Sequence, residues 1–238
     1  MKKTISTTIL IMACILFEGC ITIKASQTDR NMYGQTQTTD DCTTRSVKMS
    51  NVTEVTSSAV TDIIYRQGRN CTVELKGSSC NLNRIIIETE GSRLIIKEKD
   101  KNKKDKNKSD NVTVFITAPS LEHISFSGVG DISMPEEVKL HTFSCTHKGV
   151  GNIRLNDLTC DNVSVDAKGV GDVNINGHVR QTTSITHSGV GNINLNVHTD
   201  KLIIRSQGVG DVNLSGKAAN YDISNNKVGK LNTSNLSR

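Results

Sequence analysis

A short phrase of the form Gly-Val-Gly-Asp/Asn occurs five times in the second half of this 238-residue chain. Successive copies are 21, 20, 20 and 19 residues apart, and a degenerate sixth copy, KVGKLN, follows at residues 227–232. A nearly constant period of this length is the signature of a solenoid, in which each repeat forms one coil that stacks on its neighbours. The repeat therefore limits the fold more than any other feature of the sequence.

The residues between the glycines decide which solenoid forms. Aliphatic residues recur four and six positions after each first glycine, as in Val173 and Ile175, and again four positions before it, as in Val165. An apolar spacing of two, flanked by polar residues, predicts strands with one face inward, whereas a helical repeat needs a period near 3.6. Stacked in register, the strands bury like side chains in columns, and coils rise by about 4.8 Å each. We therefore predict an all-β parallel β-helix with coils of about 20 residues.

The glycines are predicted to be structural turn residues. Glycine adopts positive φ without steric cost, and it leaves room for the backbone of a neighbouring coil where turns stack directly. This role is assigned to Gly128, Gly130, Gly149, Gly151, Gly169, Gly171, Gly189, Gly191, Gly208 and Gly210. The valine between each pair is expected to point into the corner of the core.

The residue after each second glycine forms a further column, made of Asp131, Asn152, Asp172, Asn192 and Asp211. Because aspartate alternates with asparagine, each carboxylate has an amide neighbour instead of a like charge. His147 and His187 occur only on the asparagine coils, and Ala167 and Ser206 take that position on the aspartate coils, which indicates a duplicated two-coil unit. Calcium-binding β-rolls repeat every nine residues, so the 20-residue period predicts no calcium site. We expect no metal and no other cofactor.

The first 25 residues have the features of an export signal. Lys2 and Lys3 precede an apolar run over residues 9–17, which is too short to span a bilayer as a mature helix. Two processing routes stay open: lipidation at Cys20, or secretory cleavage after Ala25. Residues 26–44 have little apolar content and are expected to form a flexible tether, and residues 45–235 a single domain. The mature protein is expected outside the cytoplasm, in the periplasm or at the outer membrane and cell surface.

The cysteines and the charge pattern constrain the fold and the function less than the repeat does. Beyond the signal lie five cysteines, of which Cys71 and Cys80 flank TVELKGSS and are candidates for a disulfide that closes a small loop. The formal net charge of +5 is concentrated in residues 97–110, which hold seven lysines, four acids and no apolar residue. We interpret this segment as a solvated hairpin insertion, since its interspersed acids do not fit a nucleic-acid-binding arm. No nucleic-acid partner is expected.

The order of segments resembles a known family. A strand pair with YRQG, a GSRLIIK hairpin and the stretch TAPSLEHISFSGVGD are followed by serial glycine turns over about residues 45–235. This is similar to the autotransporter-adhesin head domain, also called the GIN domain, of exported proteins from Bacteroides-like bacteria. The usual turn of that family is Gly-Ser-Gly-Asp, so valine at the middle position makes these turns more apolar. The resemblance implies a β-helical fold and a surface or periplasmic location.

Three functional hypotheses follow. The first is a non-catalytic binding or adhesion module of the cell envelope, whose ligand is an unknown glycan or protein and which contacts the membrane only through a lipid anchor at Cys20. The second is a β-helical carbohydrate-active enzyme, but such enzymes cluster acids in one groove, and here the acids lie one per turn. The third is an envelope scaffold that self-associates through an exposed end coil. We favour the binding module and expect no enzymatic activity.

Overall fold

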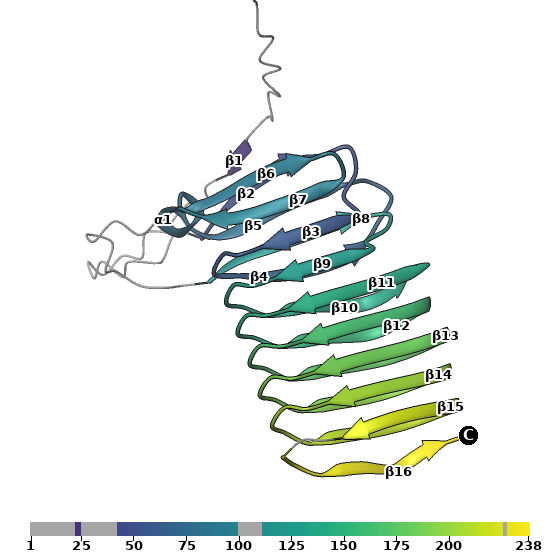
Figure 1. Ribbon diagram of the computed structural model, residues 1–238. Helices are drawn as coiled ribbons and strands as arrows, with labels where there is room; N and C mark the ends of the chain where they lie inside the picture. The colour runs from purple at the N-terminus through teal and green to yellow at the C-terminus, as the bar shows by residue number, and fades with distance from the viewer. Residues whose placement is uncertain (1–21, 25–41, 100–110, 226–227) are drawn as a thin grey trace, which may run out of the picture.

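The computed structural model describes residues 22–24, 42–99, 111–225 and 228–238 and shows a parallel β-helix, which confirms the predicted fold class (Figure 1). Seven strands and a short helix precede the first regular coils: β1 (Thr22–Lys24), β2 (Cys42–Lys48), β3 (Glu54–Ser57), β4 (Thr61–Gln67), β5 (Thr72–Ser78), α1 (Ser79–Leu82), β6 (Ile85–Glu90) and β7 (Arg93–Glu98). The remaining strands are β8 (Val112–Ala118), β9 (His123–Phe126), β10 (Ile132–Lys139), β11 (Thr142–His147), β12 (Ile153–Ala167), β13 (Val173–His187), β14 (Ile193–Ser206), β15 (Val212–Asn225) and β16 (Leu231–Ser237).

Each coil is flattened into two strand runs joined at the Gly-Val-Gly turn. We call the runs that follow these turns the post-turn sheet and the runs that precede them the pre-turn sheet. In each of the long strands β12 to β15, one element contains both runs. The chain bends between the two runs, at the corner opposite the turn, and in β12 and β13 this bend appears as a shift of register, for example between Val179 and Thr182. Neighbouring coils pair in parallel over both runs, so that Val173 lies beside Ile193 and Ile185 beside Ile204.

The core lies between the two sheets and is built from the predicted columns. Ile124, Cys145, Val165, Ile185 and Ile204 pair in succession along the pre-turn sheet, and each is at most 1% exposed. The residues four and six positions after each first glycine form two more buried columns from Ile132 and Met134 to Val212 and Leu214. The period-two pattern of the sequence therefore sets which side chains face the core.

The N-terminal part closes one end of the solenoid with antiparallel strands (Figure 1). β5 pairs antiparallel with β2 and β8, and the β6–β7 hairpin extends the opposite sheet through the parallel pair of β7 with β3. Helix α1 connects the two sides, and the Arg45 guanidinium donates hydrogen bonds to the backbone oxygens of Leu82 (3.3 Å) and Ile85 (3.0 Å). We call residues 42–99 the cap.

Two predictions about this half were wrong. Residues 97–110 do not connect a hairpin, because β7 pairs with β3 and β6 whereas β8 pairs with β4 and β5. The folded body also begins earlier than residue 45, since β2 starts at Cys42 and pairs with β5. The predicted signal and tether lie almost entirely outside the described residues; within them, Thr22–Lys24 pairs antiparallel with β2. No helix in the described part of the chain has the length and hydropathy needed to cross a membrane.

Candidate functional site: asparagine columns on the post-turn sheet

The turns stack so tightly that glycine is required at both positions. The second glycine has φ between +139° and +148° at Gly130, Gly151, Gly171, Gly191 and Gly210, a region that residues with a Cβ rarely adopt. A Cβ at Gly169 would lie 1.9 Å from the backbone oxygen of Gly149, and the other first glycines of the repeat face the same obstacle. The backbone closes a ladder here, because Val170 N–H donates to Gly149 O and Gly171 N–H to Val190 O.

The valines of the turns point outward, which corrects the expectation that they fill the corner of the core. From Val129 to Val209 they are between 45% and 51% exposed. They form in-register bridges along a line that begins at Val60 and continues to Val228. The corner is instead occupied by backbone, because two glycines without side chains let successive turns approach each other directly. We call this line the valine ridge.

The Asp/Asn column binds the backbone of the following coil. Asn152 N–H donates to Asp131 Oδ1 (2.7 Å), Asp172 N–H to Asn152 Oδ1 (2.8 Å) and Asn192 N–H to Asp172 Oδ1 (2.7 Å). The column continues into the cap, where Asp131 N–H donates to Asp62 Oδ1. Carboxylate and amide oxygens both accept this bond, which explains why both residue types fit the position.

Asp131 is the column member with an ionic partner, the Arg154 guanidinium. Burial raises the pKa of this carboxyl, but hydrogen bonds from the Asn152 backbone and from Arg154 outweigh it and hold the pKa below its ordinary value. Among the described residues, no three His, Cys, Asp or Glu side chains form a group that could hold a metal ion. The oxygens of the turn column thus accept backbone hydrogen bonds from the following coil.

The histidines and core cysteines lie in the interior. His147 and His187 are each 2% exposed and share one column with Ala167 and Ser206, as the two-coil interpretation predicts. His147 stacks on Phe126, with ring centroids 5.5 Å apart, and burial lowers its pKa, partly offset by Asp131. Burial raises the pKa of the Cys145 and Cys160 thiols to about 12, so these thiols are protonated and unreactive at neutral pH.

The candidate disulfide is absent, because Cys71 and Cys80 are both free. Cys71 precedes β5 and Cys80 lies in α1 beyond the other end of that strand. A seven-residue strand holds its ends about 20 Å apart, whereas a disulfide joins Cα atoms separated by less than about 7 Å. Cys20, the candidate lipidation site, lies outside the described residues.

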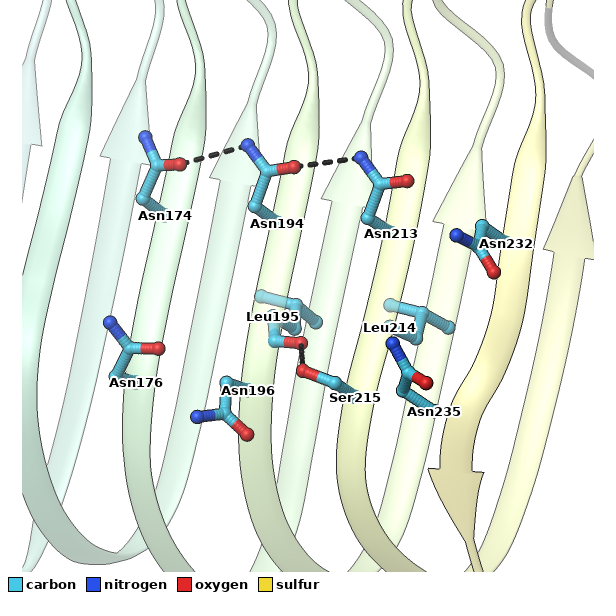
Figure 2. Close-up of a pocket in the computed structure, with 10 residues that line it drawn as sticks. All are labelled: Asn174, Asn176, Asn194, Leu195, Asn196, Asn213, Leu214, Ser215, Asn232 and Asn235. Carbon is cyan, nitrogen blue, oxygen red and sulfur yellow. Dashed lines mark hydrogen bonds between the residues drawn. The ribbon is translucent and has the colours of Figure 1, made fainter.

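Asparagines instead mark the outer face of the post-turn sheet, over the last coils of the solenoid. One column contains Asn174, Asn194, Asn213 and Asn232. The column two residues further along contains Asn176, Asn196 and Ser215, and a shift of register in the last coil adds Asn235 to it. Asn194 Nδ2 donates to Asn174 Oδ1 (2.9 Å), and Asn213 Nδ2 donates to Asn194 Oδ1 (2.8 Å), so these amides form a ladder (Figure 2). We call the two columns the asparagine array.

The array surrounds a shallow hollow of about 200 Å³ on the outer face of the sheet; the side chains of Leu195 and Leu214, which also line it, point into the core and are 2% and 3% exposed (Figure 2). The side chains of Asn176 and Asn196 have no hydrogen-bond partner among the described residues and are exposed. Each amide carries two donor hydrogens and an acceptor oxygen, so the ladder still leaves groups for a ligand. These groups repeat at the interstrand distance of about 4.8 Å along the solenoid axis.

Sequence reasoning placed the turn glycines and missed the array. Asparagine follows an aliphatic residue in four successive repeats, after Val173, Ile193, Val212 and Leu231, and aligning the copies displays this recurrence. The recurrence was hidden because a polar residue between two apolar ones is ordinary strand alternation.

A family model with the description "Putative auto-transporter adhesin, head GIN domain" matches residues 51–191 and 180–238. The chain belongs to this family. The match covers the cap from residue 51 onward, the Gly-Val-Gly coils and the asparagine array, and it confirms the resemblance drawn from the sequence. No curated protein is significantly similar to the chain.

Solved structures share the fold. A putative adhesin from Bacteroides fragilis is 24% identical with a TM-score of 0.65, and the alignment covers 84% of this chain and 98% of that one. A putative adhesin from Parabacteroides distasonis is 15% identical, with a TM-score of 0.53 and the same coverage. A third structure, described as a putative lipid binding protein from Parabacteroides distasonis, is 15% identical with a TM-score of 0.55 and covers 82% of this chain and 95% of that one.

Proposed function

We propose that this protein is an exported, non-catalytic binding module of the cell envelope that holds an extended glycan along the asparagine array. The observation that carries the proposal is the pair of in-register amide columns around an open hollow. Membership in an adhesin family supports the binding role. The carboxylates of the turn column are engaged by backbone N–H groups, an arrangement suited to holding the fold rather than to acid–base chemistry.

A repeated amide column suits a repeated ligand. Amide groups donate to and accept from hydroxyl groups equally, and a column that repeats every coil contacts successive units of a chain that runs parallel to the solenoid axis. Binding would then gain from many weak contacts on one polymer, so that long glycans bind better than short ones of the same composition.

A glycan array probed with the purified chain tests this proposal. The double variant Asn176→Ala, Asn196→Ala removes two exposed amides and is expected to weaken binding to any positive glycan by about tenfold. The matched control, Thr182→Ala with Ser184→Ala, changes two outward side chains of the pre-turn sheet and is expected to bind like the parent. Equal binding by both double variants would contradict the proposal, and release of shortened sugars from a bound glycan would show an enzyme instead.

Export is the second part of the proposal, and mass spectrometry of the native product tests it. Cleavage before Cys20 with lipid on that residue retains Thr22–Lys24, the strand that pairs with β2. Cleavage after Ala25 removes this strand. A product that begins at an unmodified Ser26 supports simple secretion, and an intact Met1 contradicts both routes.

A further inference from the structure

The valine ridge is an unusual surface for a folded chain. Among the described residues, large apolar side chains that are exposed comprise the ridge valines from Val129 to Val228 together with Tyr221 and Leu231. The ridge valines are contiguous, because each bridges to the next along the axis. A continuous line of exposed apolar side chains, unlike isolated ones, marks an interaction surface.

A groove runs along one side of this ridge. Its floor is the backbone of the first glycines, which have no side chains, and its far wall is the column formed by Ser127, Lys148, Lys168, Ser188 and Gln207. The hollow measures about 710 Å³ and extends over five successive turns. We call the column from Ser127 to Gln207 the polar wall. Across the turn the columns therefore follow in the order polar wall, first glycines (the groove), valine ridge, second glycines and Asp/Asn column.

We propose that this surface joins two copies of the chain side by side, each valine ridge lying in the groove of the other. Symmetry restricts how this can occur. A two-fold axis parallel to the solenoid axis places both ridges in both grooves at once, because it reverses the order of the columns in the second copy. A two-fold axis across the solenoid keeps that order, so the two ridges would meet and neither could enter a groove. The interface is therefore parallel and isologous.

Charge supports the same arrangement. With each ridge in the groove of the other copy and equivalent coils at the same level, the polar wall of one copy lies over the second glycines of the other, one position from its Asp/Asn column. This brings Lys168 beside Asp172 and Gln207 beside Asp211 of the second copy, and it places Ser127 beside Asp131. Each of these pairs joins a donor to an acceptor, and no level of the interface opposes two like charges. An antiparallel arrangement would place the polar wall of one copy against the polar wall of the other and would lose this match at every level.

Lys168 and Asp172, at the middle of the interface, can rearrange to meet each other. Lys168 Nζ lies 2.6 Å from its own Asp166 carboxylate, but both side chains are partly exposed, and such a pair is worth little. Asp172 uses Oδ1 to accept the Asn192 backbone N–H, which leaves its second oxygen for a lysine. The apolar ridge would supply the affinity, and the flanking columns would set the register.

Sedimentation of the purified chain over a range of concentrations tests the proposal. The parent is expected to form dimers, and Val170→Lys, which places a charge in the middle of the ridge, is expected to weaken the dimer by more than about tenfold. Asn196→Lys makes the same change in the asparagine array and should leave the dimer intact. Conversely, Val170→Lys should keep glycan binding, so the failure of either proposal is distinguishable from the failure of the other.

A thermal melt shows whether Val170→Lys is folded. If it is not, Val170→Thr, which keeps the side-chain shape, replaces it, and a smaller loss of dimer affinity is expected.

Oxidative cross-linking tests whether the two copies are parallel. Val209→Cys should form a dimer disulfide above the level of the parent, because equivalent coils face each other. A chain that stays monomeric, a dimer that is unaffected by Val170→Lys, or cross-linking only between mixed Val129→Cys and Val209→Cys variants would overturn the proposal. Monomers that instead sediment with anionic phospholipid vesicles would assign the ridge to a membrane.

Discussion

The cap and the regular coils pack their side chains in different ways. From β10 to β15, every position has a counterpart one coil away, so each side chain packs on residues much like itself. In the cap, the antiparallel pairs of β2, β5 and β8 bring together residues that occur once, such as Tyr65 and Arg45. Stability in the coils is a sum of similar neighbour contacts, whereas the cap depends on individual contacts that close the end of the core.

The largest difference in stability is expected between alanine substitutions at two glycines, one in the coils and one in the cap. A Cβ at Gly171 would lie 1.9 Å from the Gly151 backbone oxygen, at φ +144°, whereas Gly91 in the β6–β7 turn has φ +61° and open space around it. Gly171→Ala should therefore lower the free energy of unfolding by more than about 4 kcal/mol, because the backbone of the preceding coil cannot move without opening the ladder. Gly91→Ala should cost only about 1–2 kcal/mol.

Urea unfolding of both variants measures these costs. A Gly171→Ala variant as stable as Gly91→Ala would show that the turns of neighbouring coils are not in contact.

The next effect separates the inner and outer positions of a single coil. Ile185 is fully buried between Val165 and Ile204, so Ile185→Asp places a charge in the core and is expected to prevent folding or to cost about 4–5 kcal/mol. Asn194→Asp changes an outward side chain and should cost less than about 1 kcal/mol, since only one amide donor is lost. Circular dichroism and solubility decide between them. Equal tolerance would contradict the assignment of the inward columns.

A smaller effect is expected in the cap. The Tyr65 hydroxyl is buried and donates to Ala118 O (2.9 Å), and burial raises its pKa, so it stays protonated as a donor. Tyr65→Phe should cost about 1 kcal/mol, because Ala118 O keeps a second partner in the Gly68 N–H. Thermal melts are the measurement, with Phe115→Tyr as a change of the same group on an outward position. A cost above about 3 kcal/mol would mean that the cap is less tolerant than proposed.

The repeat explains why so much of the solenoid was predictable. Identity between coils puts the same residue type in the same column, so periodicity alone gave the strands, the parallel register and the turn glycines. It failed where a choice depends on backbone geometry, as for the valines: whether the middle residue of the turn faces in or out follows from how closely the glycines stack. It also failed in the cap, where β7 and β8 join different strands although they are neighbours in sequence.

The smallest effects are expected in the Asp/Asn column, which runs through both regions. Because the folded-state pKa of Asp131 is lowered, its carboxylate contributes stability that is full above the ordinary aspartate pKa of about 3.9 and is lost as the pH falls through the folded-state value. Asp131→Asn should thus cost less than about 1 kcal/mol at pH 7, since its side chain is about one-third exposed, and nothing in strong acid. Urea unfolding at several pH values measures the difference. A cost that persists unchanged in acid would contradict the ionic contribution.

Asp172→Asn, in the middle of the coils, should change the melting temperature least of all. It extends the amide column already present at Asn152 and Asn192, and its Oδ1 still accepts the Asn192 backbone N–H. Melts with and without calcium make this the strictest test of the turn column. If calcium stabilises the parent and Asp172→Asn abolishes that gain, the column is a metal-binding array; if calcium changes neither melt, its oxygens serve the backbone of the next coil, where Asp and Asn are equivalent.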